Sequence, residues 1–351
     1  MGLVQHYPAM NRPSAPVCSV CIANYNGVAL LADCLESVYA QQHAVADIEV
    51  IVHDDASTDA SVPLLHERYP QVELLASQEN VGFCVSNNRM VAHARGEFIL
   101  LLNNDAMLMP GAIAALLEAA RMGGVKDILT LAQYDWQTGT LVDHGCRLDL
   151  FYNPVPQSEE SDSEIAMTIG ACLWIRRDVW HTLGGFPVWM ESIGEDLYLC
   201  CTARLRGGRV RVAAGSGYRH WQGKTFGGNR AGEGGLSSTL LRRRLSERNK
   251  TFAMFTCTPG MVVVPLLLAH LVLLMVEGVL LSVIRHNSRL FRDIYLAVPR
   301  ALIAQRNTLC RVRHDNMAAR RISTGEYFRA FAWRPRKLSM LIRYGWPRIR
   351  R

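Results

Sequence analysis

Short apolar runs alternate with helical patterns through the first third of the chain. The apolar runs predict strands at residues 17–23, 48–53, 72–76 and 98–102, and helical patterns fill the intervals between them. The run at 98–102 is apolar throughout, as expected for a strand that is covered on both faces. This β-α-β-α order predicts an α/β fold with a mostly parallel sheet and helices on both of its faces.

Polar clusters follow three of these strands, at the point where each strand ends. They are Asn24-Tyr25-Asn26, Asp54-Asp55 and Asn103-Asn104-Asp105. The carboxyl ends of parallel strands share one edge of a sheet, and that edge is where such sheets bind ligands. The carboxylates would repel one another there unless a cation or a ligand rich in hydrogen-bond donors lies among them.

Taken in order, these clusters resemble the motifs of the family 2 glycosyltransferases, which have the GT-A fold. The group most similar in character is the rhamnosyltransferase-like branch of bacterial surface-polysaccharide synthesis. Two further stretches support the resemblance, Asn80-Val81-Gly82-Phe83 and Asn87-Asn88. The resemblance implies a set of nucleotide-binding residues: Asn24, Tyr25, Asn26, Asp54, Asp55, Asn80, Gly82 and Asn87.

The resemblance also implies a divalent cation, Mg²⁺ or Mn²⁺, bound by Asp105 and bridging the two phosphates of the donor. The cation would neutralise charge on the departing nucleoside diphosphate. Asn103 takes the place of the first acid of the family motif, and an amide oxygen can still act as a ligand. His220 is the third expected ligand, in a position where the family often has a histidine.

Gly194-Glu195-Asp196-Leu197 resembles the family segment that carries the catalytic base. The resemblance makes Asp196 the base, which would take the proton of the acceptor hydroxyl during an inverting displacement. In isolation the two acids could simply cap the following helix. We expect contacts to acceptor or donor from Asn104, Glu195, Trp174 and Lys224.

Charge is distributed unevenly along the chain. The net charge is +7, but residues 285–351 contain 17 Lys and Arg against three Asp and Glu. Hydrophobic residues make up 49% of the chain, which excludes a disordered or fibrous protein. The ten cysteines are scattered, which favours buried thiols over a disulfide scaffold.

These patterns divide the chain into three parts. Residues 1–16 are expected to be a flexible leader. Residues 17–250 form the glycosyltransferase domain, with a nucleotide-sugar-binding half at 17–109 and an acceptor half at 110–250. Residues 251–351 combine an apolar helix with a basic, amphipathic tail that associates with membranes.

Residues 261–284 are apolar and are flanked on both sides by arginines. Because positive flanks favour the cytoplasmic face, we expect an in-plane or re-entrant helix, with a single span as the competing arrangement. The protein would then lie at the cytoplasmic face of the bacterial inner membrane. The adjoining apolar run favours an anionic membrane surface, rather than nucleic acid, as the partner of the basic tail.

The expected activity is inverting transfer of a sugar from a dTDP-, UDP- or GDP-linked donor to a hydroxyl of a lipid-linked saccharide. Two alternatives remain open at this point. One is a nucleotidyltransferase-like enzyme, which would usually have a Gly-rich phosphate loop with a basic residue after the first strand. The other is a non-catalytic, membrane-associated protein that binds nucleotide sugars, although Asp105 and Asp196 are both present.

Overall fold

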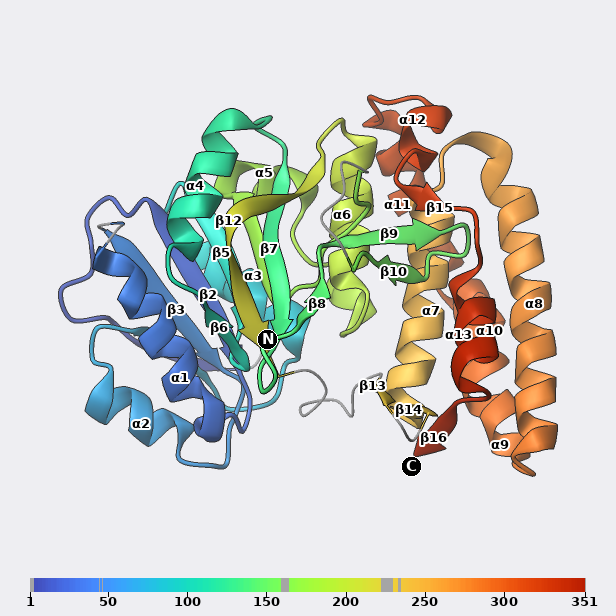
Figure 1. The fold of residues 1–351 in the computed structure, drawn as a ribbon, viewed down its shortest axis with the longest axis horizontal. Helices are drawn as coiled ribbons and strands as arrows, with labels where there is room; N and C mark the ends of the chain where they lie inside the picture. Colours follow the sequence, from blue (N-terminus) through green and yellow to red (C-terminus); the bar gives the residue numbers. More distant parts are fainter. Residues whose placement is uncertain are drawn as a thin grey trace.

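A large mixed β-sheet forms the centre of one half of the molecule, and a layer of helices forms the other half (Figure 1). The computed structural model describes residues 3–43, 45, 47–158, 164–221, 230–232 and 235–350. The strands are β1 (Val4–Tyr7), β2 (Cys18–Asn24), β3 (Ile48–Asp54), β4 (Glu73–Ser77), β5 (Phe98–Asn103), β6 (Ala106–Leu108), β7 (Ile128–Asp135), β8 (Leu141–Asp143), β9 (Cys146–Asp149), β10 (Pro154–Pro156), β11 (Cys172–Arg176), β12 (Val210–His220), β13 (Arg230–Gly232), β14 (Gly235–Thr239), β15 (Phe331–Ala332) and β16 (Arg348–Arg350).

The helices divide between the faces of the sheet and the C-terminal layer. They are α1 (Val28–Tyr39), α2 (Ser61–Arg68), α3 (Phe83–His93), α4 (Ala112–Met122), α5 (Arg177–Leu183), α6 (Glu195–Leu205), α7 (Leu240–Cys257), α8 (Val263–Ile284), α9 (Ser288–Leu290), α10 (Ala297–Ala304), α11 (Arg306–Ala318), α12 (Thr324–Phe328) and α13 (Arg336–Tyr344).

The main sheet has the strand order β1-β4-β3-β2-β5-β11-β7-β12-β6. Strands β4, β3, β2 and β5 are parallel, which confirms the α/β prediction for the first third of the chain. Strand β11 is antiparallel to both β5 and β7, so the sheet becomes mixed in its second half. The parallel strands therefore deliver their carboxyl ends, and the polar clusters that follow them, to one edge.

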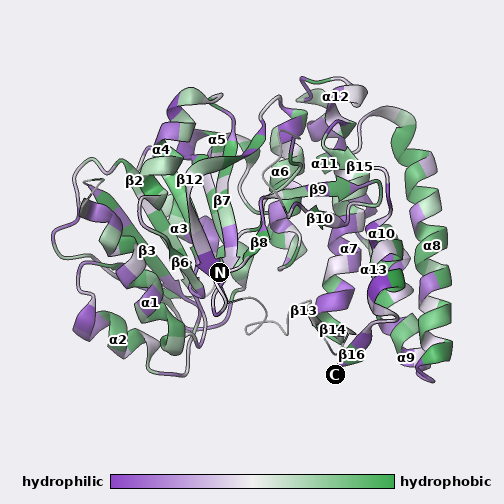
Figure 2. Ribbon diagram, in the orientation of Figure 1, coloured by the Kyte–Doolittle hydropathy of each residue, from purple (hydrophilic) through white to green (hydrophobic). Residues whose placement is uncertain are grey.

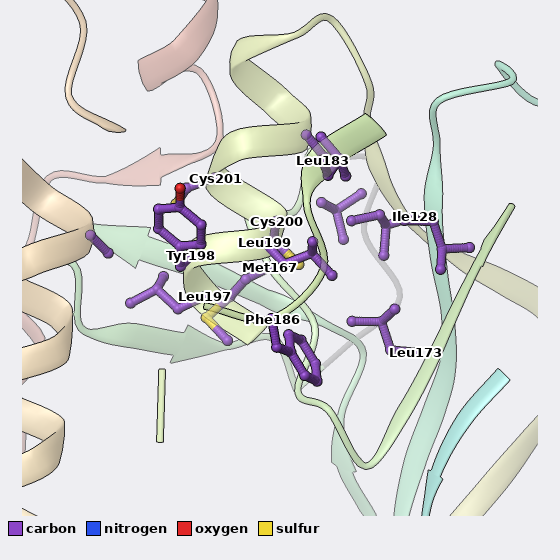
Figure 3. Packing of buried hydrophobic residues seen from close by; sticks show 14 of the residues in the cluster. Ile128, Met167, Leu173, Leu183, Phe186, Leu197, Tyr198, Leu199, Cys200 and Cys201 are labelled. Atoms are coloured by element: carbon purple, nitrogen blue, oxygen red, sulfur yellow. The ribbon is translucent and has the colours of Figure 1, made fainter. Parts of the chain in front are cut away.

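Apolar side chains fill both faces of the sheet. On one face, Ile128 and Leu173 of the sheet belong to the same buried cluster as Leu197 and Leu199 of α6 (Figure 3). On the other face, a second buried cluster joins the sheet to α1 and α4. Packing from both sides explains why the strand at Phe98–Asn103 carries an almost unbroken apolar run.

Residues near the N-terminus are more ordered than expected for a flexible leader. Val4–Tyr7 forms β1, which pairs antiparallel with β4 at the edge of the sheet. Arg12 lies 2.6 Å from carboxylate oxygens of both Glu49 and Glu73, two buried acids of β3 and β4. Buried carboxylates need cationic partners, and the supposed leader supplies one of them.

The C-terminal layer is built on α7, which packs against α6, α8 and α11. Helix α8 lies at the outer edge of this layer and is hydrophobic along almost its whole length (Figure 2). One face of α8 is buried, through Val263, His270, Leu274, Gly278 and Leu281. Gly278 is required there, because a Cβ atom would lie 2.5 Å from the ring of Tyr295.

The opposite face of α8 exposes large apolar side chains, including Leu268, Val272, Val279 and Val283. By length and composition alone, Gly260–Ile284 is a candidate membrane span, and 22% of its most apolar stretch is buried in the protein. The helix therefore combines a docked face with an apolar outer face.

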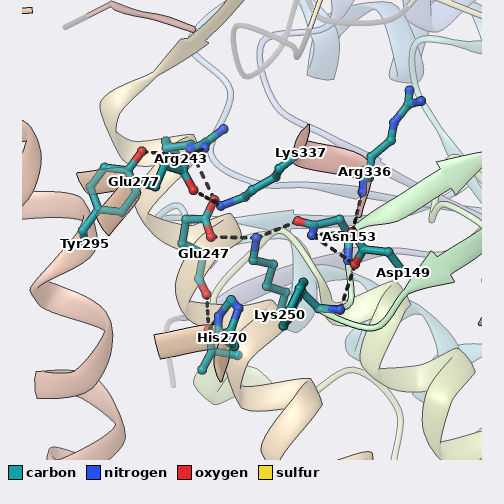
Figure 4. Close-up of polar contacts among 12 residues, drawn as sticks. Asp149, Asn153, Arg243, Glu247, Lys250, His270, Glu277, Tyr295, Arg336 and Lys337 are labelled. Carbon is teal, nitrogen blue, oxygen red and sulfur yellow. Dashed lines mark hydrogen bonds and ion pairs between the residues drawn. The ribbon is translucent and has the colours of Figure 1, made fainter. Parts of the chain in front are cut away.

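A network of ion pairs anchors α8 to its neighbours (Figure 4). Glu277 of α8 pairs with Arg243 of α7 and, at 2.5 Å, with Lys337 of α13. Glu247 of α7 lies 2.7 Å from Lys337 and 2.6 Å from Lys250. The charged residue that interrupts the apolar helix is thus paired inside the protein.

Candidate active site

The ends of β2, β3 and β5 meet in a buried hydrogen-bonded cluster. The amide of Asn24 donates to Asp54 at 2.8 Å and accepts from Asn104 at 2.8 Å. Asp54 also accepts from the hydroxyl of Ser57 at 2.7 Å. Asn104 therefore acts here as a support for Asn24, since its amide is engaged inside the cluster.

Asp55 holds the loop that contains Asn80 and Gly82. Its two carboxylate oxygens accept the backbone N–H groups of Val81 and Gly82 at 2.7 and 2.9 Å. Burial raises the pKa of Asp55, and the two N–H donors oppose that rise. The structure thus brings together Asp55 and Gly82, which are 27 positions apart in the sequence.

Tyr25 and Asn26 lie at the opening of this cluster. The ring of Tyr25 is exposed, and Asn26 accepts the N–H of Thr58 at 2.7 Å.

Three asparagines lie in or just before α3. Asn80 is exposed, whereas Asn87 is buried and donates to the carbonyl of Phe83 within α3. The neighbouring Asn88 is tied by two hydrogen bonds to the backbone of Phe186. Asn87 therefore supports its own helix, and its expected nucleotide contact stays a prediction.

Asp105 and His220 face each other at the end of β5 and β12. The Nε2 atom of His220 lies 3.2 Å from Oδ1 of Asp105, and both side chains are buried. Pairing of β12 with β6 produces this approach, because it sets His220 opposite Ala106. The Nδ1 atom of His220 is buried and has no hydrogen-bond partner among the described residues. Asn103, two residues before Asp105, is partly exposed.

Asp143 lies near this pair, although the sequence analysis did not identify it. Burial raises the pKa of its carboxyl group, and the charge of His220 acts in the opposite direction. Asp143 ends β8, which pairs with β7 beside β12. Asp105 and His220 offer a carboxylate and an imidazole, which are donors suited to a divalent cation, whereas Asp143 is linked to them only through the influence of His220 on its pKa.

Glu195 and Asp196 begin α6 on the other side of the site. The backbone N–H of Gly170 donates to Oδ2 of Asp196 at 3.0 Å, and that of Leu197 donates to Oδ1 at 2.7 Å. The first contact comes from a distant segment, so Asp196 does more than cap its own helix. Oε2 of Glu195 is buried without a hydrogen-bond partner in the described part of the chain.

Burial is the main reason that both acids resist ionisation. It raises the pKa of Asp196, and it raises that of Glu195 to about 8 together with repulsion from Asp196. Arg242, at the start of α7, opposes both shifts. Raised carboxyl pKa values at a shared cleft are typical of proton-transfer groups.

A tight loop positions these two acids. Glu191, Ile193 and Gly194 all have positive φ angles, with Gly194 at 97°. The side-chain amide of Asn249 donates to the carbonyls of Met190, Ser192 and Ile193. Because Asn249 belongs to α7, the C-terminal helical layer holds the loop in place.

One expected contact residue lies in the core, and another lies outside the described residues. Trp174 is 1% exposed and stacks on Phe98 in the core, so its predicted contact with acceptor or donor is wrong in this structure. It lies in the middle of β11, two residues from the end that faces the site. Lys224 lies outside the described residues.

Two residues near the site were missed by the sequence analysis. Asp143 precedes a His-Gly turn and belongs to none of the motifs, and Arg242 is part of a run of arginines before the apolar helix. Only the pairing of β8 with β7 and the packing of α7 on α6 bring them to the site. Nothing in their local sequence distinguishes them from other charged residues.

Comparisons with known proteins show which family and which folds the chain resembles. The model of glycosyl transferase family 2 matches residues 19–184. A relative from Mycobacterium tuberculosis, an N-acetylglucosaminyl-diphospho-decaprenol L-rhamnosyltransferase, is 27% identical over 180 residues, which are 42% of this chain and 59% of that protein. This chain spans between 26% and 62% of the length of the first curated relatives that it matches.

Solved structures share the fold at low identity. The TarS 1-349 structure from S. aureus in complex with UDP-GlcNAc superimposes with a TM-score of 0.55 at 18% identity, covering 90% of this chain and 93% of that one. A mannosyltransferase from Pyrobaculum calidifontis in complex with GDP-Man and Mn²⁺ gives a TM-score of 0.51 at 16% identity, covering 92% and 88%. The fold is therefore GT-A, and residues 19–184 are similar to glycosyl transferase family 2.

Proposed function

We propose that this protein transfers a sugar from a nucleoside-diphosphate sugar to a hydroxyl of a lipid-linked saccharide, with inversion at the anomeric carbon. The observation that carries the proposal is the arrangement of the site. A hydrogen-bonded cluster lies at the ends of β2, β3 and β5, where it would bind the base of the donor, and the acids Glu195 and Asp196 stand at the start of α6.

Asp196 is the proposed base. Its Oδ2 atom is oriented by the N–H of Gly170, and burial keeps its proton affinity above that of a free aspartate. A group with raised proton affinity can accept the proton of the acceptor hydroxyl as its oxygen attacks. A single base acting on the face opposite the leaving group gives inversion.

Asp105, His220 and Asn103 are the proposed ligands of a divalent cation, to which we add Asp143. The buried Nδ1 of His220 and the short distance to Asp105 fit such a group. A bound Mg²⁺ or Mn²⁺ would stabilise charge on the leaving diphosphate. EDTA should abolish activity, and Asp105→Ala should weaken binding of nucleoside diphosphate more than that of the nucleoside. Equal losses for both ligands would contradict a metal role for Asp105.

The donor is tested directly by measuring nucleoside diphosphate release from a panel of dTDP-, UDP- and GDP-sugars in the presence of membrane extract. One donor should give release that depends on the extract and disappears in Asp196→Asn. Release from none of the donors, by a folded protein that binds no nucleoside diphosphate, would refute the proposal.

We also propose that the protein lies at the cytoplasmic face of the inner membrane, with α8 parallel to the bilayer. Pairing of Glu277 with Arg243 and Lys337 supports a helix docked on the protein, with its exposed apolar face toward lipid. Cys310 is exposed and the other nine cysteines are buried, so Cys310→Ser removes the reactive background. A reporter thiol introduced by Arg350→Cys should then resist impermeant reagents in intact cells. Labelling there would favour a single span.

A further inference from the structure

A basic pocket lies apart from the site described above, between the β9–β10 hairpin and the start of α13. Its volume is about 390 Å³, which is within the range of small-molecule sites. Three arginines line it, Arg147, Arg334 and Arg336, together with Trp333, Gln157 and Ser339. No acidic residue is among its lining residues, so the pocket carries an uncompensated positive charge.

The three guanidinium groups differ in how they are held. Arg147 is fixed, because it donates to the carbonyl of Phe331 at 2.5 Å. In the described part of the chain, neither Arg334 nor Arg336 has a carboxylate partner for its side chain. Asp149 is the nearby acid, and it already accepts the backbone N–H of Arg336 and the amide of Asn153. Figure 4 shows the Arg336 side chain extending away from that network. The free guanidinium groups are therefore available to an anion.

Exposed apolar side chains stand beside the pocket. Trp333 is 81% exposed, and Ile342 of α13 is 79% exposed. Ile342 follows Ser339 by three positions, so the two lie on the same side of the helix. Leu338, at 54% exposed, precedes Ser339. A basic pocket bordered by an aromatic ring and aliphatic side chains matches a phosphate that carries a hydrocarbon chain.

The pocket is connected to the active site through the polypeptide backbone. Gln157 exchanges hydrogen bonds with the backbone of His144 and Gly145, at 2.7 and 3.0 Å. Those two residues directly follow Asp143, which lies near His220. Cys146, the next residue, is close enough to Asp143, Asp196 and Arg336 for their charges to influence its thiol. The backbone hydrogen bonds of Gln157 therefore link the pocket to the segment that follows Asp143.

We propose that Arg147, Arg334 and Arg336 bind the phosphate groups of a lipid, with the hydrocarbon chain leaving past Trp333 and Ile342. This inference rests on the proposed function, in which the acceptor is lipid-linked, and it places the phosphate end of that acceptor. Two sources share this chemistry, the diphosphate of an isoprenoid carrier and the headgroup of an anionic phospholipid. Guanidinium groups suit both, because they form paired hydrogen bonds with phosphate oxygens.

The test compares Arg334→Gln/Arg336→Gln with a matched control, Arg306→Gln/Arg311→Gln, which removes the same charge from exposed positions of α11. Farnesyl diphosphate is the soluble probe, and farnesol is the uncharged reference. Binding is measured with EDTA present, so that a cation at the donor site does not contribute. Flotation with phosphatidylglycerol and phosphatidylcholine vesicles tests the phospholipid source.

We expect the pocket variant to bind farnesyl diphosphate, phosphatidylglycerol vesicles or both about tenfold more weakly, as for two lost charge-assisted contacts. The affinity of the control for both probes should stay within about twofold of that of the parent protein. Farnesol, which has no phosphate, should bind equally to the parent protein and to both variants. Loss for farnesyl diphosphate identifies the isoprenoid carrier, and loss for vesicles alone identifies the phospholipid. Unchanged binding of both probes, or an equal loss in the control, overturns the proposal.

Nucleoside diphosphate affinity separates this proposal from the proposed function. It should be unchanged in the pocket variant, which also reports that the variant is folded. If sugar transfer is absent but the arginines bind lipid phosphate, only the proposed function fails. If transfer occurs and the arginine variant binds lipid phosphate as tightly as the parent protein, only the pocket assignment fails.

Discussion

Glu247 and Glu277 lie among cations in the C-terminal layer, whereas Glu195 and Asp196 lie at the start of α6 with few charged neighbours. Burial opposes ionisation of Glu247, but Lys250, Lys337 and Arg243 outweigh it and hold its pKa well below the usual range. Burial prevails at Glu195 and Asp196, and their pKa values rise. The same residue types thus become ionised structural anchors in one region and groups with a raised pKa in the other, according to their neighbours.

The largest effect should come from removing a charge from the anchor region. Glu247→Gln leaves Lys250, Lys337 and Arg243 without their shared carboxylate, and should lower the free energy of unfolding by about 3–5 kcal/mol. Denaturant unfolding measures this. Glu191→Gln is the control, because Glu191 is 59% exposed and pairs with Arg248 at the surface. It should cost less than about 1 kcal/mol. Similar losses in both variants would contradict the contrast.

In the other region, Asp196→Asn should leave stability nearly unchanged and lower turnover by about 10²-fold or more, as for a lost general base. Nucleoside diphosphate binding and circular dichroism should match the parent protein. If turnover falls only when the protein also loses stability, Asp196 belongs with the anchors.

Glu195 should make stability depend on pH. Its pKa in the folded protein is about 8, above that of the unfolded chain, so the native state holds the proton more tightly. Stability from this group is complete at low pH and is lost as pH rises toward 8. The melting temperature of the parent protein should therefore fall between pH 5 and pH 8. In Glu195→Gln that fall should be smaller by about 2–4 °C. Parallel melting curves for both proteins would contradict the raised pKa.

The smallest effect concerns Arg242, the cation near the catalytic acids. Its charge lowers the pKa of both Glu195 and Asp196. Arg242→Gln should therefore move the acidic limb of the kcat/KM profile to higher pH, by less than about one unit. Arg244→Gln serves as the neighbouring control. An unchanged limb, or the same shift in the control, would show that Arg242 does not act on this pair.

The parallel half of the fold could be predicted because each of its strands is covered on both faces, which leaves a local apolar signature. Strands β2 to β5 and the polar residues at their ends follow that signature closely. Strand β1 could not be predicted in this way, since only its pairing with β4 and the ion pairs of Arg12 order it.

The site was predictable where its residues belong to contiguous motifs. Asp105, His220 and Asp196 fall within such stretches, and the structure brings Asp105 and His220 together. Trp174 shows where prediction from the sequence ends. Alternation along a strand separates the side chains into two faces, but it does not tell which face meets the ligand. Asp143 and Arg242 reach the site only through tertiary packing, which no local pattern records.

Asn249 ties three backbone carbonyls of the catalytic loop to α7, and α7 continues to Cys257 beneath the apolar helix. The predicted domain boundary at residue 250 thus falls inside a helix, two residues before the fully buried Phe252. A chain shortened at 250 would lose the second part of α7, whose side chains are mostly buried in the core. The sheet-containing half and the C-terminal helical layer consequently cannot be exchanged as separate modules between proteins, and any shortened form must retain α7 in full.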